Sequence, residues 1–171
     1  MPKSVATPAY DRSTLRPGIV HIGCGNFHRA HQAVYLDDLF ALGIGHDFGL
    51  VGAGVRPGDA KMREVLAAQD WLSSVIELDQ GHAAARVIGA MVDFLPIEAG
   101  NAALIAQMAK ATTKIVSLTV TEGGYYIDPK TGTFSPDHPD IQADAANPTR
   151  PNTAFGAILE ALRQRRAANI A

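Results

Sequence analysis

The sequence has a single cysteine, Cys24, and this scarcity excludes several classes of protein. One cysteine cannot form an intrachain disulfide, and it provides no thiolate cluster for zinc or an iron–sulfur centre. There is also no excess of positive charge, because 15 basic side chains stand against 17 acidic ones, for a formal net charge of −2. Nucleic-acid phosphates require a basic surface, so we expect no nucleic-acid partner.

Long hydrophobic runs are lacking as well. Residues 1–17 contain prolines at 2, 8 and 17 and several charged side chains, without the apolar centre of a signal peptide. The most apolar stretches, such as residues 115–120, are far shorter than the roughly 20 residues that cross a bilayer. We therefore expect a cytoplasmic protein without a membrane partner.

The composition that remains is typical of one globular domain. The 171 residues are 47% hydrophobic and 19% charged. A chain of this length buries about 70% of its unfolded surface without help from disulfides or metals. We divide it into an irregular leader, residues 1–17, and a folded domain, residues 18–171.

Apolar periodicity predicts strands that alternate with helices. Strands are expected at 19–22, 48–55 and 114–120, hairpins at 71–91 and 125–134, and helices at 29–42, 59–69, 101–111 and 153–168. The second strand of the first hairpin is expected at 84–91, the run 114–120 has the clearest features of a buried strand, and 135–151 is expected to be a polar connection. This alternation implies an α/β fold with a doubly wound, mostly parallel sheet covered on both faces.

The end of the chain is informative about the sheet. A crossover helix at 153–168 should lead to a further strand, so we expect the sheet to be incomplete at its C-terminal end. The chain then looks like the first part of a longer protein. A terminal helix that simply docks on the sheet is the alternative.

A glycine turn, Gly23-Cys24-Gly25, follows the first strand and precedes the first helix. In dinucleotide-binding turns the first glycine makes the bend and the second allows the backbone to approach a pyrophosphate. The third glycine of the usual pattern is replaced by His28, so the motif is incomplete. The turn indicates either a nucleotide site or a plain strand-to-helix connection.

An acidic residue that binds an adenosine ribose should follow the second strand. Counting about 20 residues from the turn reaches Asp47, but Asp47 precedes that strand and would lie at the wrong end of the sheet. Asp59 lies beyond the strand, and we choose it on geometry. The alternative is that Asp59 only caps the helix that begins there.

Other polar residues have weaker claims to a role in chemistry. His28 and His31 could share a helical face, but no carboxylate or thiolate is spaced to complete a metal site, so we expect none. Arg29 is placed to contact a phosphate at the start of the helix, whereas His21 is expected to be a satisfied core residue. Glu122 follows the strand 114–120, where α/β sheets place ligands, although a turn glutamate is equally consistent. Tyr125 and Tyr126 are expected to pack.

Several blocks of sequence closely resemble the mannitol dehydrogenase family, the long-chain polyol dehydrogenases related to fructuronate and tagaturonate reductases. The blocks are residues 18–31 (GIVHIGCGNFHRAH), 68–70, 87–89, 115–125 (IVSLTVTEGGY), 153–156 and 165–166. Two of these blocks, the first among them, are specific to this family, and the resemblance extends over about residues 18 to 168.

The resemblance implies a Rossmann-type domain that binds NAD or NADP without zinc and precedes a mainly helical domain. Asp59 matches the family's ribose-selecting aspartate, while Gly58 replaces a second acid of some relatives and weakens a strict NAD preference. Glu122 matches a family glutamate near the reaction centre and is the catalytic candidate. The resemblance also assigns cofactor binding to Ile19, Val20, His21, Ile22, Gly23, Cys24, Gly25, Asn26, Phe27, His28, Arg29 and Ala30.

The sequence also departs from the family. The family's catalytic lysine, and the asparagine and histidine that polarise the substrate oxygen, belong to its second domain and have no match here. We therefore predict the cofactor-binding part of an NAD-dependent oxidoreductase that interconverts a sugar alcohol and a ketose, inactive by itself. A hexuronate reductase, a methyltransferase and a non-catalytic nucleotide-binding module are the alternatives.

Overall fold

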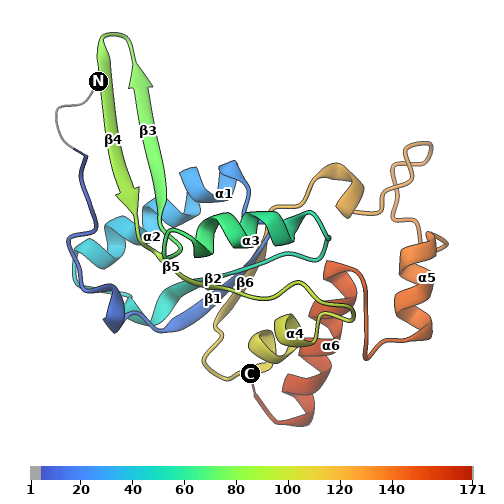
Figure 1. Ribbon diagram of the computed structural model, residues 1–171. Coiled ribbons are helices and arrows are strands. Elements are labelled where there is room, and N and C mark those ends of the chain that lie inside the picture. Colours follow the sequence, from blue (N-terminus) through green and yellow to red (C-terminus); the bar gives the residue numbers. More distant parts are fainter. Residues whose placement is uncertain (1–4, 171) are drawn as a thin grey trace.

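A computed structural model describes residues 5–170, apart from the side chains of His82 and Glu122. Its centre is a four-stranded parallel sheet in the order β5–β2–β1–β6 (Figure 1). The strands are β1 (Pro17–Ile22), β2 (Gly49–Ala53), β5 (Met91–Phe94) and β6 (Ile115–Leu118). The chain builds the sheet outward from β1 through β2 to β5, and then returns to place β6 on the other side of β1. The topological switch point therefore lies between β1 and β6.

Four of the described helices lie between these strands in the chain, and the last two follow β6. The helices are α1 (Asn26–Ala30), α2 (Gln32–Ala41), α3 (Asp59–Ala67), α4 (Ala102–Ala109), α5 (Pro139–Ala146) and α6 (Ala154–Ala167), with short 3₁₀ turns η1 (Arg12–Thr14), η2 (His46–Phe48) and η3 (Glu122–Gly124). None of the helices in the described part of the chain combines the length and apolar character needed to cross a membrane.

β1 is buried on both faces, and its side chains alternate between two cores. Ile19 faces a core that contains Phe40 of α2 and Leu66 of α3. Val20 and Ile22 face the opposite core, which α4 and α6 complete. The predicted doubly wound sheet, covered on both faces, is confirmed.

The helix predicted at 29–42 is two helices. α1 begins at Asn26, directly after the glycine turn, and the chain breaks at His31 (φ −125°, ψ −83°) before α2 starts. The His31 ring contacts the carbonyl oxygen of Phe27 (Nδ1···O 2.8 Å). Apolar periodicity does not register a one-residue break, since the helical face continues on either side of it. Gly43 follows α2 with φ +77° and ends it as predicted.

The predicted hairpin forms, but its second strand is shorter than expected. β3 (Ser73–Asp79) pairs antiparallel with β4 (His82–Ile88), and together they project from the body of the molecule (Figure 1). The predicted strand 84–91 ends at Ile88, and β5 is a separate strand, absent from the prediction, that pairs with β2.

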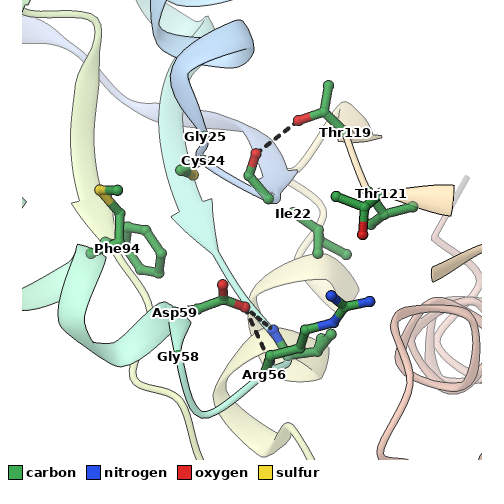
Figure 2. Close-up of a pocket in the computed structure, with 13 residues that line it drawn as sticks. Ile22, Cys24, Gly25, Arg56, Gly58, Asp59, Phe94, Thr119 and Thr121 are labelled. Carbon is green, nitrogen blue, oxygen red and sulfur yellow. Dashed lines mark hydrogen bonds between the residues drawn. The ribbon is translucent and has the colours of Figure 1, made fainter. Parts of the chain in front are cut away.

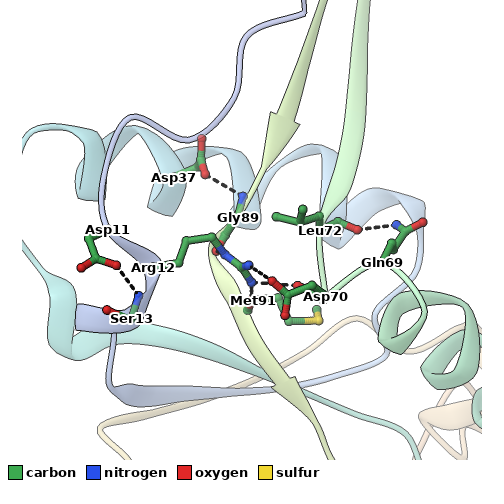
Figure 3. Close-up of polar contacts among 9 residues, drawn as sticks. All are labelled: Asp11, Arg12, Ser13, Asp37, Gln69, Asp70, Leu72, Gly89 and Met91. Carbon is green, nitrogen blue, oxygen red and sulfur yellow. Dashed lines mark hydrogen bonds and ion pairs between the residues drawn. The ribbon is translucent and has the colours of Figure 1, made fainter.

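Side chains distant in sequence divide β4 from β5 (Figure 3). The Asp37 carboxylate accepts a hydrogen bond from Gly89 N (2.8 Å). The Arg12 guanidinium donates to the carbonyl oxygens of Gly89 (3.0 Å) and Met91 (2.9 Å). These bonds replace the ladder bonds that a continuous strand would make, so the strand stops. Arg12 also pairs with Asp70, which anchors the leader.

Three further predictions, all for residues after 113, are corrected. β6 lies at an edge of the sheet, where Ile115 and Val116 keep 43% and 39% of their surface exposed, so it is not a buried strand. The connection 135–151 contains the helix α5, capped by His138. The small hairpin at 125–134 is reduced to one bridge between Ile127 and Phe134. α6 begins where predicted.

Candidate functional site

A pocket of about 290 Å³ lies where the carboxyl ends of the parallel strands meet (Figure 2). Four segments line it: residues 22–25 at the end of β1 and in the turn, a segment from Val55 to Met62 after β2, Phe94 of β5, and residues 119–121 after β6. Ligands of open α/β sheets bind at this edge, beside the switch point.

The two glycines of the turn differ in what surrounds them. Gly23 has φ +95°, and a Cβ at this position would lie 2.4 Å from the carbonyl oxygen of Thr119, so a side chain is excluded by both conformation and space. A Cβ at Gly25 would meet no atom within 4 Å, since this position opens onto the pocket that it lines. Gly23 therefore makes the bend, and Gly25 leaves the backbone accessible to a ligand.

Asp59 lines the same pocket from the start of α3. Its Oδ2 accepts hydrogen bonds from the backbone N–H groups of Val55 and Arg56, both at 3.0 Å. The carboxylate thus closes the loop before the helix and does not cap the helix, whose N-cap is Gly58. No described residue hydrogen-bonds to Oδ1, which is free to accept a bond from a ligand.

The two arginines near the pocket are placed differently from the sequence-based expectation. Arg29 turns its guanidinium onto the turn itself and donates to the carbonyl oxygen of Cys24 (2.6 Å) and to Oδ1 of Asn26 (2.6 Å). It does not line the pocket, whereas Arg56 does. Arg56 is exposed, and its side chain makes no hydrogen bond or ion pair within the described residues. Sequence reasoning missed Arg56, although a basic residue in the loop between β2 and Asp59 was a usable signal.

His21 and His28 stack on each other beneath the turn. Their ring centroids are 3.7 Å apart, the rings are inclined by 14°, and both side chains are buried. Burial lowers the pKa of His21 to about 4 and that of His28 to about 3, so both are neutral near pH 7. Among the side chains that the structure describes, no group of three His, Cys, Asp or Glu could hold a metal ion.

The remaining predicted cofactor residues surround the pocket at different depths. Ile22 and Cys24 line it, and burial raises the pKa of the Cys24 thiol to about 12, so the thiol is inert. Phe27 is 66% exposed and stacks on His31 with ring centroids 4.3 Å apart. Those that do not reach the pocket lining are Ile19, Val20, His21, Asn26, Phe27, His28, Arg29 and Ala30.

The catalytic candidate, Glu122, lies in η3 directly beyond β6, and its side chain is outside the described part of the structure. Tyr126 nearby donates a hydrogen bond to Asp140 (3.4 Å) and packs edge-on against the His138 ring. Burial raises the pKa of Tyr126. These contacts agree with the packing role expected of Tyr126, while Tyr125 is 42% exposed.

The strand order, the glycine turn and the pocket at the switch point together define a Rossmann-type domain of the dinucleotide-binding class. Comparison with known families agrees, because a model described as the mannitol dehydrogenase Rossmann domain matches residues 17–171. The chain belongs to this family, as the sequence blocks predicted.

Relatives of known sequence or structure share this domain. The chain is 69% identical to a mannitol 2-dehydrogenase of Cereibacter sphaeroides, over 99% of this chain and 35% of the relative. It is 47% identical to the solved Pseudomonas fluorescens mannitol 2-dehydrogenase in ternary complex with NAD and D-mannitol, with a TM-score of 0.91 over 99% of this chain and 35% of that one. A D-sorbitol dehydrogenase in substrate-free form follows at 39% identity and TM-score 0.89, over 98% of this chain and 35% of that one. The chain therefore spans about a third of the length of the relatives it matches.

Proposed function

We propose that this chain is the cofactor-binding part of an NAD-dependent oxidoreductase of the mannitol 2-dehydrogenase type, which interconverts a sugar alcohol and a ketose. The observation that carries the proposal is the pocket at the switch point, in a chain 47% identical to a protein solved with NAD and D-mannitol. The names of the relatives support the substrate class, because the mannitol and sorbitol enzymes both act on polyols.

The residues of the pocket fit a dinucleotide. Gly25 opens toward the space that a pyrophosphate would take, and Oδ1 of Asp59 can accept a hydrogen bond from a ribose hydroxyl. Arg56 supplies a positive charge to the same pocket, and we propose that it attracts the phosphates. When bound, NAD supplies the hydride acceptor, and these residues bind it and orient its ring toward the substrate.

Glu122 remains the proposed catalytic residue of this chain because it follows β6 at the edge where the nicotinamide end of a dinucleotide would lie. Oxidation of a carbinol also requires a base for the hydroxyl proton and donors that hold the substrate oxygen. We propose that these groups belong to the part of the relatives that this chain does not span.

Titration of the 171-residue chain with NADH, and separately with S-adenosylmethionine, tests the proposal. We expect saturable binding of NADH and none of S-adenosylmethionine. Arg56→Ala should weaken NADH binding several-fold without a change in thermal midpoint, because the side chain holds no other described group. Arg166→Ala, an exposed arginine on α6, is the matched control. Binding of S-adenosylmethionine in preference to NADH would contradict the proposed function.

A further inference from the structure

Thr119 lies beside the glycine turn because β1 and β6 are parallel neighbours, with Ile22 opposite Leu118. The backbone N–H of Thr119 donates to the carbonyl oxygen of Ile22 (3.0 Å), and its hydroxyl donates to the carbonyl oxygen of Gly23 (2.7 Å; Figure 2). The same Gly23 oxygen accepts a bond from Gly25 N (2.8 Å). The Gly23 carbonyl oxygen therefore has two donors: the Gly25 N–H within the turn, and the Thr119 hydroxyl from beyond the end of β6.

The direction of that hydroxyl bond determines which nitrogen of His21 carries the proton. A hydroxyl carries one proton, and Thr119 gives it to Gly23, so the Thr119 oxygen must accept from Nε2 of His21, 3.0 Å away. A neutral imidazole has one N–H, so Nδ1 of His21 is then an acceptor. Its partner is the hydroxyl of Ser117, at 2.8 Å.

The same reasoning extends to the second histidine. The Ser117 oxygen lies 3.3 Å from both the amide nitrogen and the amide oxygen of Gln32. Since Ser117 donates its one proton to His21, its oxygen accepts from the amide nitrogen. The amide oxygen of Gln32 then accepts from Nδ1 of His28 (3.1 Å). Every donor in the chain points the same way, from His28 through Gln32, Ser117 and His21 to the turn.

Nε2 of His28 is left as a buried acceptor with no hydrogen-bond partner among the described residues. A buried polar atom without a partner destabilises a fold, and an apolar side chain of similar size would avoid that cost. His28 is nevertheless stacked face to face on His21, which keeps the His21 ring in the plane that both hydroxyls require. Packing alone does not account for two histidines here.

We propose that Thr119 is a positioning residue for the dinucleotide turn, and that the chain His28–Gln32–Ser117–His21 holds its hydroxyl in the orientation that binding needs. If His21 carried its proton on Nδ1 instead, Thr119 would have to donate to Nε2 and release the Gly23 oxygen. The turn that faces the pyrophosphate would then lose the hydrogen bond from the Thr119 hydroxyl to the Gly23 carbonyl oxygen. This inference rests on the proposed function, and its test separates the two.

The first measurement is NADH affinity of the 171-residue chain. Thr119→Val keeps the side-chain shape without the hydroxyl and should weaken NADH binding about tenfold, the effect of one lost hydrogen bond. Thr119→Ser restores the hydroxyl and should restore affinity, which a purely steric role would not do. Thr112→Val, an exposed threonine before the opposite end of β6, is the matched control. Unchanged affinity in a folded Thr119→Val chain, or no recovery in Thr119→Ser, would overturn the proposal.

The second measurement needs no cofactor. Nitrogen-15 NMR of the histidine side chains distinguishes the two neutral tautomers, and we expect Nε2–H for His21 and Nδ1–H for His28. In Thr119→Val, His21 should lose its single tautomer, because Nε2–H no longer has an acceptor. Finding Nδ1–H or a doubly protonated ring at His21 near pH 7 refutes the inference, even where Thr119→Val does not fold. Absence of NADH binding by the wild-type chain contradicts the proposed function. In that case the NMR measurement of the tautomers still tests the direction of the hydrogen bonds.

Discussion

The polar groups around the pocket are of two kinds: some hydrogen-bond to the protein backbone, and others face the pocket. Mutations of the two kinds should have different effects. Arg29 and Oδ2 of Asp59 hold loops in place through backbone partners. Arg56, Oδ1 of Asp59 and the open side of Gly25 have no such partner among the described residues and line the pocket. Changes in the first set should alter stability, and changes in the second set should alter ligand binding.

Asp59 should discriminate against NADP, because its charge repels a 2′-phosphate and its free oxygen can bond a 2′-hydroxyl. We expect Asp59→Ala to narrow the ratio of NAD to NADP affinity about tenfold or more. Asp59→Asn is the matched variant, since an amide oxygen can still accept the Val55 and Arg56 N–H groups while the charge is gone. Both dissociation constants, measured by calorimetry, should move in both variants. An unaltered ratio would contradict the assignment of Asp59 to the ribose.

A side chain at position 25 should be compatible with the fold but not with a bound dinucleotide. Gly25→Val is expected to abolish NADH binding and to preserve the thermal midpoint, because the added atoms enter only the pocket. Gly23→Ala should instead lower the thermal midpoint, because its Cβ would approach the Thr119 carbonyl at positive φ. Fluorescence titration and thermal unfolding of both variants check this contrast. Normal NADH affinity in a folded Gly25→Val chain would mean that the turn is only structural.

The contact of β1 with α1 and β6 buries two neutral histidines, and this burial makes the free energy of unfolding depend on pH. The ordinary pKa of 6.5 applies in the unfolded chain, whereas burial lowers it to about 4 for His21 and about 3 for His28. Between these values the unfolded state binds more protons than the folded one. Stability is therefore complete above pH 6.5 and falls as the pH decreases, by up to about 1.4 kcal/mol per pH unit for each histidine.

Urea unfolding at pH 7.5, 6.5 and 5.5 measures this dependence. Glu160, a buried carboxyl group, contributes little in this range, because hydrogen bonds from Arg163 lower its pKa to about 2. His28→Asn removes one of the two titrations and should reduce the slope by about half. A free energy of unfolding that stays constant from pH 7.5 to 5.5 would show that the histidines are not held neutral.

Elements that depend on local contacts were predicted correctly, whereas elements that depend on contacts between distant segments were not. α6 was predicted from periodicity and a cap, because Thr153 accepts a hydrogen bond from Gly156 N within the same turn. The division between β4 and β5 was not predicted, because it depends on Arg12, which is 77 residues from Gly89. A pattern read along the chain contains the first kind of contact and not the second.

For the whole molecule, the arrangement predicts a domain that binds its cofactor without turnover. The purified 171-residue chain should form no NADH from mannitol, sorbitol or arabinitol at saturating NAD, because general-base catalysis alone typically contributes about 10²–10⁴-fold and the groups for it have no match here. The assay should be repeated with the remaining domain of a relative added, where turnover is expected. Robust turnover by the chain alone would refute the placement of the catalytic groups outside it.

The alternation of strands with helices and the bend at Gly23 follow from the sequence, because periodicity, caps and turn glycines act between residues close in the chain. Tertiary structure alone decided that β6 lies at an exposed edge, that Arg56 rather than Arg29 lines the pocket, and that His21 meets Thr119. That last pair is separated by 98 residues, and its contact exists only because the sheet places β6 beside β1. Contacts of this kind depend on the packing of the complete domain, which no local pattern encodes.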